Sequence, residues 1–210
     1  MLLGKETLRR YTDLHALIYL LKNKAITMLN PGLWPDTNDS FSLSVHKNKY
    51  NLKTLLALCF AHASEKYHHW HVFAQGNSGV CIVFKYDDFV HHLSGIPGIT
   101  CNFVEYLLIR EYERKVSSNE PVNLPFIKRF GYKDEKEYRV IYEDINDKYE
   151  TKDINIPLSV IDRIEFNPWI PEPLFKTTRQ LLLGIADVDR MRITQSQLIN
   201  NKRWKELAGL

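Results

Sequence analysis

The sequence predicts an α+β fold in which helices flank a mixed, mainly antiparallel sheet. The chain has 210 residues, of which 44% are apolar and 25% are charged, which suits one compact domain with a hydrophobic core. Runs of strand length alternate with helical patterns, but without the regular rhythm of a parallel sheet. Proline and glycine stand singly at joints rather than in a linker. We therefore expect residues 1–210 to form one domain.

The first elements alternate strand and helix. Residues 8–13, LRRYTD, predict a short strand, and Thr12 or Asp13 can cap the helix that follows. One face of that helix is apolar and comprises Leu14, Leu17, Ile18 and Leu21. Residues 25–29 predict a second strand. Residues 30–41, NPGLWPDTNDSF, contain too much Pro, Asn and Asp for regular structure and are expected to form a loop.

The later elements complete the sheet. β-branched and aromatic residues predict strands at residues 55–60, 80–86, 137–143 and 161–166. A helix capped by Ser64 and ending in a glycine turn is expected between the first two of these strands. A helix with Pro173 in its first turn and a strand within residues 190–199 follow near the end of the chain.

Charge and cysteine usage limit the possible classes of protein. The net charge of +3 is a mild bias toward anionic partners, so any attraction of nucleic acid must come from local patches. Cys59, Cys81 and Cys101 are odd in number and lie in apolar runs, which indicates buried, reduced thiols. No segment has the length of a signal peptide or of a membrane span. A soluble, cytoplasmic protein is expected.

Glu137 is the candidate catalytic residue. It begins the strand EYRVIYE, whose alternation places Glu137, Arg139 and Ile141 on one face. A carboxylate and a guanidinium then project together. The ordinary alternative is a charge pair on a solvated strand face, since charge-rich strand ends are common.

Two further regions offer candidate ligand contacts. One of the adjacent Arg9 and Arg10 would point into a cleft if their strand is central, where a guanidinium suits a phosphate or a ribose. On an edge strand, both would be solvated. In the loop at residues 30–39, Trp34 offers a stacking face and Asn38 a polar contact, although Trp34 can equally plug the edge of the core.

The histidine-rich run at residues 66–73 indicates packing rather than a metal site. Neighbouring residues on a helix diverge by about 100°, so His68 and His69 do not easily face one ion. Trp70 and Phe73 share a face that suits the core first and a ring-stacking wall second. The sequence also lacks a phosphate loop, a dinucleotide fingerprint, a nucleophile elbow and a zinc-deaminase pattern.

The order of these motifs resembles a bacterial family often found among phage-defence genes. The match runs through residues 9–39, 68–84, 135–143 and 154–166, and so covers most of residues 7–167. That family is in turn similar to DarT-like ADP-ribosyltransferases. Within this group the chain most resembles the mRNA-modifying toxin of a toxin–antitoxin–chaperone system. A histidine is usual in that family where this chain has Arg-Tyr-Thr at residues 10–12.

The resemblance implies that residues 1–210 form one ADP-ribosyltransferase-like domain. It implies that the protein is an NAD-dependent ADP-ribosyltransferase toxin, with NAD as a substrate. It implies Glu137 as the catalytic residue. The residues that it implies for contacting NAD are Arg10, Tyr11, Thr12, Trp34, Asn38 and Trp70. Cleavage of the nicotinamide–ribose bond builds oxocarbenium character, so one carboxylate can supply much of the stabilisation. No metal is needed for this chemistry.

The expected acceptor is a base in single-stranded RNA or DNA, because an unstacked base is the easier target. Lys128, Arg129, Tyr132 and the segment NNKRW at residues 200–204 are candidate surface contacts for the strand. The resemblance also implies an antitoxin partner, with a chaperone as a further partner, and no membrane.

Two other classes stay open. The chain can be a non-catalytic antitoxin or a partner-binding module on the same scaffold. It can also be a metal-dependent nuclease that uses Pro35-Asp36 with Asp134-Glu135-Lys136. For the transferase, Glu137→Gln is expected to abolish transfer and to leave thermal stability nearly unchanged.

Overall fold

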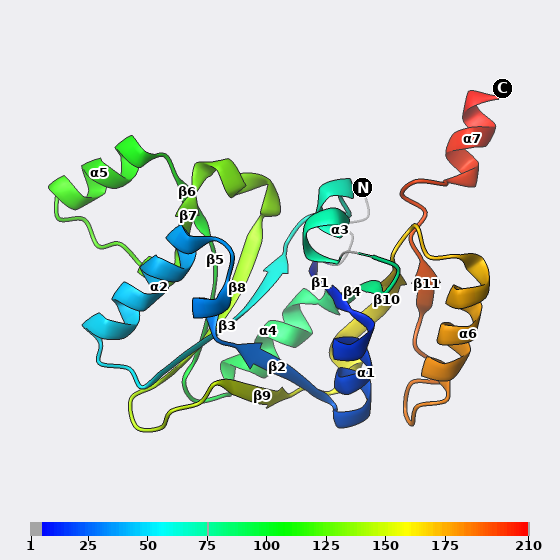
Figure 1. The fold of residues 1–210 in the computed structure, drawn as a ribbon, viewed down its shortest axis with the longest axis horizontal. Helices are drawn as coiled ribbons and strands as arrows, with labels where there is room; N and C mark the ends of the chain where they lie inside the picture. The colour runs from blue at the N-terminus through cyan, green and yellow to red at the C-terminus, as the bar shows by residue number, and fades with distance from the viewer. Residues whose placement is uncertain (1–5, 75, 210) are drawn as a thin grey trace. The chain divides into compact units, whose positions relative to one another are not determined.

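The structure is a computed structural model that describes residues 6–74 and 76–209. The chain forms two compact units (Figure 1). The first unit comprises Met1–Ala25, Ala63–Tyr86 and Asn155–Leu210, and the second comprises Ile26–His62 and Asp87–Ile154. Each unit has strands and helices of its own, described in turn below. The single domain expected from the sequence stays a prediction.

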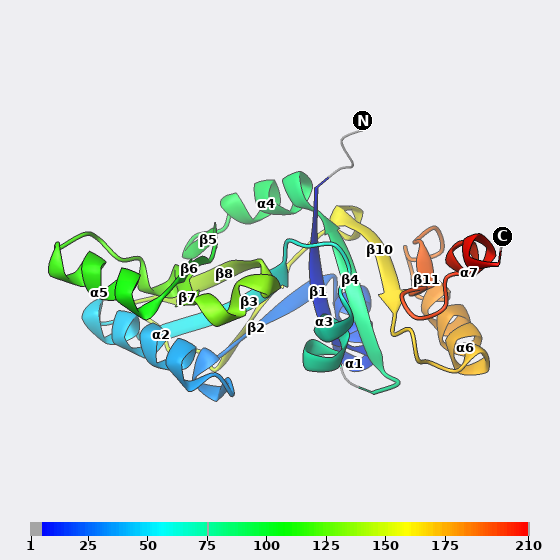
Figure 2. The ribbon, with the colours of Figure 1, turned by 90° about the horizontal axis from the view of Figure 1, so that it is seen from above.

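The first unit contains strands in the order β11-β10-β4-β1. Strand β4 is antiparallel to both β1 and β10, whereas β11 is parallel to β10. The strands are β1 (Thr7–Asp13), β4 (Gly79–Lys85), β10 (Ile161–Phe166) and β11 (Ile193–Gln195). The helices are α1 (Leu14–Asn23), α3 (Tyr67–Phe73), α6 (Glu172–Leu183) and α7 (Lys202–Ala208), with a 3-10 turn at Leu158–Val160. Figure 2 shows β10, β11, α6 and α7 grouped at one end of this unit.

Local chemistry fixes the boundaries of these elements. The Asp13 side chain accepts a hydrogen bond from the Ala16 amide and caps α1, as the sequence predicted. Lys24 adopts a left-handed conformation and ends that helix. Strand β4 begins at Gly79, where a Cβ atom would lie 2.1 Å from the carbonyl oxygen of Ala74, so only glycine fits.

The second unit contains strands in the order β9-β2-β3-β8-β5. Strand β3 is antiparallel to β2 and β8, and β5 is antiparallel to β8. The strands are β2 (Ala25–Leu29), β3 (Thr54–Ala61), β5 (Ile99–Phe103), β8 (Glu137–Asp144) and β9 (Thr151–Asn155). A separate parallel pair is formed by β6 (Glu105–Leu107) and β7 (Ile127–Arg129).

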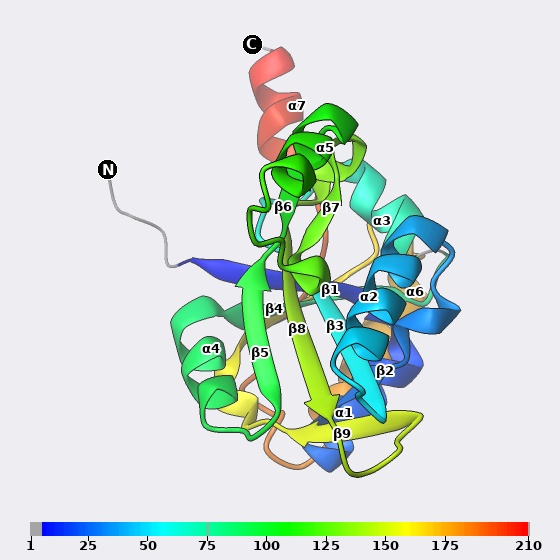
Figure 3. The same cartoon turned by 90° about the vertical axis from the view of Figure 1, so that its left-hand side faces the viewer.

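Helices cover both faces of the strands β3 and β8 in the second unit. They are α2 (Thr37–Lys49), α4 (Tyr86–Ser94) and α5 (Ile109–Ser117), with 3-10 turns at Pro31–Leu33, Leu124–Phe126 and Phe130–Glu135. Leu43 of α2 packs with Leu55 and Ile141 in one buried cluster. On the opposite face, the rings of Phe60 and Phe89 of α4 lie 5.1 Å apart. Figure 3 shows α2 running beside β3 and β8.

The predicted fold class is confirmed: the chain is α+β, with mixed, mainly antiparallel strands flanked by helices. Two local predictions were wrong. The loop expected at residues 30–41 contains the 3-10 turn and the start of α2, because Asp36 caps that helix. Helix α3 begins at Tyr67 rather than at a Ser64 cap, and its N-cap residue Lys66 makes no side-chain cap bond. Within the described residues, every helix is too short or too polar to cross a bilayer.

Candidate functional site

Glu137 and Arg139 form the centre of a buried ion cluster in the second unit. Strand alternation points both side chains to one face, as the sequence predicted, and α2 covers that face. Glu137 is 4% exposed and Arg139 is fully buried. The predicted alternative of a solvated charge pair is therefore wrong.

Arg139 uses all five of its N–H groups. Its Nε donates to Glu137 Oε1 at 2.7 Å, and its Nη2 donates to Glu137 Oε2 at 3.1 Å. Asp39 accepts from both terminal nitrogens, at 2.9 and 2.7 Å, in a bidentate pair. The remaining N–H of Nη1 donates to the carbonyl oxygen of Pro125 at 2.9 Å. This guanidinium is thus fully satisfied although it is removed from water.

Helix α2 covers the cluster, and side chains from its successive turns meet alternate side chains of β8. Asp39 contacts Arg139, Leu43 packs against Ile141, and His46 lies 2.7 Å from a carboxylate oxygen of Glu143. These helix positions are about one turn apart, and these strand positions alternate. Polar pairs at each end therefore bracket one apolar contact and fix the register of the helix on the sheet.

Lys128 of β7 completes the cluster. Its Nζ lies 2.7 Å from Glu135, 3.4 Å from Glu137 and 3.7 Å from Asp39. The Lys128 ammonium also stands over the Tyr132 ring, 4.7 Å from its centroid. The sequence predicted Lys128 as a surface contact for nucleic acid. The structure corrects this prediction, because the Lys128 side chain is only 11% exposed and its ammonium is paired with three carboxylates.

The carboxyl groups of the cluster differ in the direction of their pKa shifts. Burial alone would raise the pKa of Glu137, but the Arg139 guanidinium outweighs burial and lowers the pKa to about 2. Burial raises the pKa of Asp39 and of Glu135 above their ordinary values. Acid therefore protonates Asp39 and Glu135 first, while Glu137 stays ionised at neutral pH.

The cluster forms part of the wall of a pocket. Asp39 and Lys128 line a cavity of about 580 Å³ between α2 and α5, together with Asn38. Asn38 is exposed in the first turn of α2 rather than in a loop, and its amide donates to the capping Asp36. Glu137 lies behind Asp39 and Lys128, within hydrogen-bond reach of the Lys128 ammonium.

Trp34 also contacts Arg139. Its ring lies 5.3 Å from the guanidinium carbon, and its half-buried side chain also packs against the cluster of Leu43 and Phe126. The structure thus favours the predicted alternative in which Trp34 plugs the edge of the core, with a cation–π contact added.

In the first unit, β1 carries its buried arginine at position 9 rather than 10. Arg9 Nη1 donates to Glu165 of β10 at 2.6 Å, and its Nε donates to the carbonyl oxygen of Ala63 at 3.1 Å. Arg163 adds a second contact to Glu165 at 2.7 Å. Arg10 and Thr12 are half-buried.

Tyr11 and Trp70 lie against each other in the first unit. Their rings meet edge to face at 5.1 Å, and His69 contacts Tyr11 at 5.3 Å. Trp70 is fully buried, and its Nε1 donates to Glu65 at 2.7 Å. Burial raises the pKa of Tyr11, and its buried hydroxyl finds no hydrogen-bond partner among the described residues. The core role predicted for Trp70 is confirmed.

The three cysteines form no disulfide. Burial raises the pKa of Cys81 to about 12 and that of Cys101 to about 11, which keeps both as thiols at neutral pH. In the described part of the chain, no group of three or more His, Cys, Asp or Glu side chains is placed to hold a metal ion. Asp36, the first carboxylate of the nuclease hypothesis, caps α2, and Glu135, within the Asp134-Glu135-Lys136 part, binds Lys128.

The structure brings some predicted residues together and adds others. In the second unit, Glu137 and Trp34 both contact Arg139, and Asn38 lines the adjoining pocket. Sequence reasoning missed Asp39 as the anion that holds Arg139. Its signal was present in the helical spacing of Asp39, Leu43 and His46, which the loop prediction hid.

Comparison with known proteins gives fold-level likenesses only. No family model matches the chain, and no curated protein matches its sequence. Among solved structures, DarT of Thermus sp. 2.9 in complex with NAD+ has 10% identity and a TM-score of 0.47, over 92% of this chain and 96% of that chain. The same protein with carba-NAD+ has 11% identity and a TM-score of 0.45, over 92% and 97%. With ADP-ribosylated ssDNA the values are 8% and 0.46, over 92% and 95%.

Proposed function

We propose that this chain is an NAD-dependent ADP-ribosyltransferase that transfers ADP-ribose to nucleic acid, with Glu137 as the catalytic carboxylate. The observation that carries the proposal is a buried carboxylate that is kept ionised directly behind the wall of a pocket. A strongly perturbed carboxyl group beside a cavity is typical of catalytic sites. The resemblance of the sequence to DarT-like enzymes points to the same residue.

An ionised Glu137 suits the chemistry of NAD cleavage. As the bond from nicotinamide to ribose breaks, positive charge develops on the sugar, and a fixed carboxylate in a dry site stabilises that charge. Glu137 also accepts a hydrogen bond from the ribose 2′-hydroxyl and so orients the sugar. A pKa of about 2 keeps Glu137 negative throughout the physiological range.

Lys128 has to yield for the substrate to reach Glu137. Its ammonium lies at the pocket wall and contacts Glu137 at 3.4 Å. A pyrophosphate in the pocket attracts the same ammonium and uncovers the Glu137 carboxylate. Lys128 thus exchanges a carboxylate partner for a phosphate partner when NAD binds.

The predicted NAD contacts remain part of the proposal. They are Arg10, Tyr11, Thr12, Trp34, Asn38 and Trp70. Asn38 is the best supported, because it is exposed in the pocket that Asp39 and Lys128 line. Trp34 and Trp70 act through packing, on Arg139 and on Tyr11 respectively.

The biological setting is proposed from the resemblance of the sequence. The acceptor is a base in single-stranded RNA, with single-stranded DNA as the next candidate, and the activity serves as a toxin in phage defence. An antitoxin, assisted by a chaperone, neutralises the chain. The expected compartment is the cytoplasm, in keeping with three cysteines that form no disulfide.

The test is incubation with NAD labelled in its adenosine part, together with RNA, single-stranded DNA or cell protein in separate reactions. Wild type should release nicotinamide and label one acceptor. Glu137→Gln should lower the rate by at least about 100-fold, because it removes the charge and keeps the shape. The matched control is Glu143→Gln on the same strand, whose partner is His46, and it should keep its activity. Equal losses in both variants would mean that Glu137 has no special role.

A second candidate, a non-catalytic binding module, is favoured by one observation. The Glu137 carboxylate is almost fully covered and already bound by Arg139 and Lys128, as in a purely structural ion cluster. This candidate predicts no nicotinamide release with any acceptor. It also predicts that a folded Glu137→Gln variant keeps its partner.

A further inference from the structure

The last part of the first unit contains two neighbouring pockets. One, of about 740 Å³, lies between α6 and β11, and the other, of about 620 Å³, lies beside α7. Gln197 lines both pockets, so they form one path along this end of the chain. Figure 2 shows α6, β11 and α7 together at the same end of the first unit.

The walls of this path are rich in side-chain amides. Gln180, Gln195, Gln197 and Asn200 line the first pocket, and Gln197 and Asn201 line the second. Each amide carries both a donor and an acceptor, as hydrogen bonding to the edge of a base requires. The Gln195 nitrogen is used by the carbonyl oxygens of Pro168 and Ile170, which fixes that side chain in place.

The same segment accounts for the net positive charge of the chain. Residues 172–209 contain seven Lys or Arg and four Asp or Glu, a net charge of +3 that equals the total for the chain. All four acidic side chains are paired: Glu172 with Lys176, Asp187 with Lys24, Asp189 with Arg190 and Glu206 with Arg203. Four cations form no ion pair with any described residue, namely Arg179, Arg192, Lys202 and Lys205. Their charge is available to an anionic partner.

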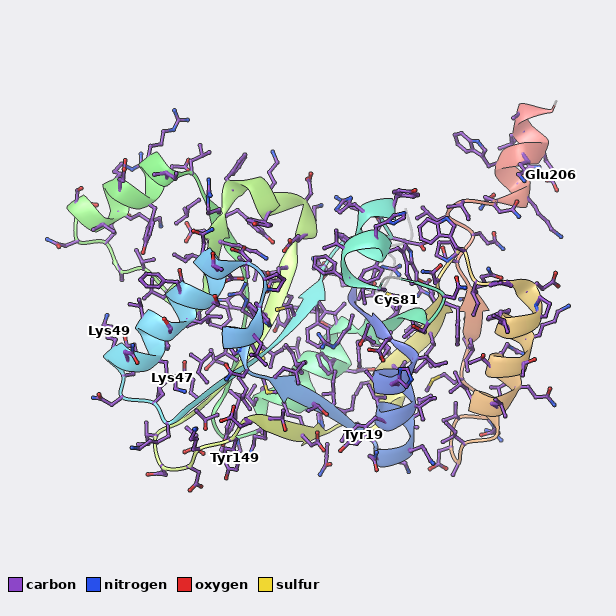
Figure 4. All side chains as sticks on the ribbon, in the orientation of Figure 1. Tyr19, Lys47, Lys49, Cys81, Tyr149 and Glu206 are labelled. Atoms are coloured by element: carbon purple, nitrogen blue, oxygen red, sulfur yellow. The ribbon has the colours of Figure 1, made fainter. Side chains whose placement is uncertain are left out.

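An exposed aromatic ring stands among these cations. Trp204 is 76% exposed on α7, between Arg203 and Lys205, and it lines the second pocket. Its backbone amide donates to the side chain of Asn201, which caps the helix and fixes the backbone at this position. Figure 4 marks Glu206 on this helix. An exposed indole between cations suits stacking on an unpaired base.

We propose that residues 172–209 form a binding surface for single-stranded nucleic acid, on which the unpaired cations contact phosphates, the amides contact base edges and Trp204 stacks on a base. The proposed function makes this strand the acceptor, but binding itself is independent of NAD. The amides that line the walls have no role on a membrane surface, where binding depends on an apolar face and on attraction to anionic lipids.

Binding is measured without NAD, by fluorescence anisotropy of a 5′-labelled single-stranded RNA of about 20 nucleotides. Trp204→Ala should weaken binding about 10-fold, since stacking of one base on an aromatic ring contributes this much. Lys202→Gln with Lys205→Gln should weaken binding and flatten its dependence on salt, by a slope of about 0.7 for each phosphate that the variant no longer neutralises. The matched control is Lys47→Gln with Lys49→Gln on α2, which removes two lysines outside the proposed surface (Figure 4).

Several results would overturn the proposal. They are unchanged affinity of the folded Trp204→Ala variant, equal losses in the two double-lysine variants, equal affinity for the duplex of the same sequence, and binding to phosphatidylserine vesicles instead of RNA. Circular dichroism checks folding, which should be unaffected because Trp204 is exposed. Nicotinamide release without an acceptor is measured in parallel. If release persists while the strand does not bind, the surface proposal fails and the transferase proposal stands.

Discussion

Two ion clusters in this chain follow the same sequence pattern and differ in burial. Strand β8 has Glu137 and Arg139 two residues apart, and β10 has Arg163 and Glu165 two residues apart. Each pair gains a further partner from another element, Asp39 of α2 in the first case and Arg9 of β1 in the second. The Arg139 side chain is 0% exposed, whereas that of Arg163 is 18% exposed.

The difference shows what a covering helix adds to a strand pair. Helix α2 lies over Arg139 and supplies a bidentate carboxylate, so that pair is removed from water on all sides. Arg163 instead shares its charge with Asp162, whose side chain is 38% exposed. Coulombic attraction is stronger where water is excluded, but so is the cost of removing one partner. The covered cluster adjoins a cavity between α2 and α5.

The largest change in stability is expected when Arg139, the centre of the covered cluster, is replaced. Arg139→Met leaves Asp39 and Glu137 facing each other with Lys128 as the remaining cation. We expect the free energy of unfolding to fall by about 3–5 kcal/mol, the usual cost of breaking a buried ion pair. Urea unfolding followed by circular dichroism measures this. A loss below about 1 kcal/mol would show that the cluster is not a structural element.

The next effect is the response of Glu137 to acid. Its pKa in the folded protein, about 2, lies below the ordinary 4.5, so its stabilisation is complete above about pH 4.5 and is lost as the pH falls toward 2. The fall corresponds to about 3 kcal/mol. Glu137→Gln should therefore be less stable than wild type by about that amount at pH 7. The expectation of unchanged stability assumed an exposed side chain, and burial removes that basis.

The measurement is urea unfolding of wild type and Glu137→Gln between pH 7 and pH 3. The difference between the two proteins should be constant down to about pH 4.5 and then shrink. Lys49→Gln serves as a control, because lysine does not titrate in this range. A difference that is independent of pH would contradict the lowered pKa of Glu137.

Strand periodicity was enough to place Glu137, Arg139 and Ile141 on one face, since that depends only on local geometry. Their burial depended on α2, which the sequence hid. Pro31 and Pro35 suggested a loop, yet both precede Asp36, which caps the helix. Likewise, Lys128 lies in the exposed-looking segment FIKRFGYK, and only the fold turns it toward Glu137. Local patterns thus predicted directions, whereas burial required knowledge of long-range contacts.

The smallest change in stability is expected in the other cluster, that of Arg163 and Glu165. Arg163→Met removes the matching arginine from the first unit, where Glu165 keeps its contact with Arg9 at 2.6 Å. Because the Arg163 pair is partly hydrated, we expect a loss below about 1 kcal/mol in the free energy of unfolding. Urea unfolding of wild type and Arg163→Met at low and at high salt measures this loss. The loss should be smaller at high salt, because salt screens partly exposed charges. A loss as large as that for Arg139→Met would mean that burial by a helix does not distinguish the two clusters, and that their shared two-residue spacing alone sets their strength.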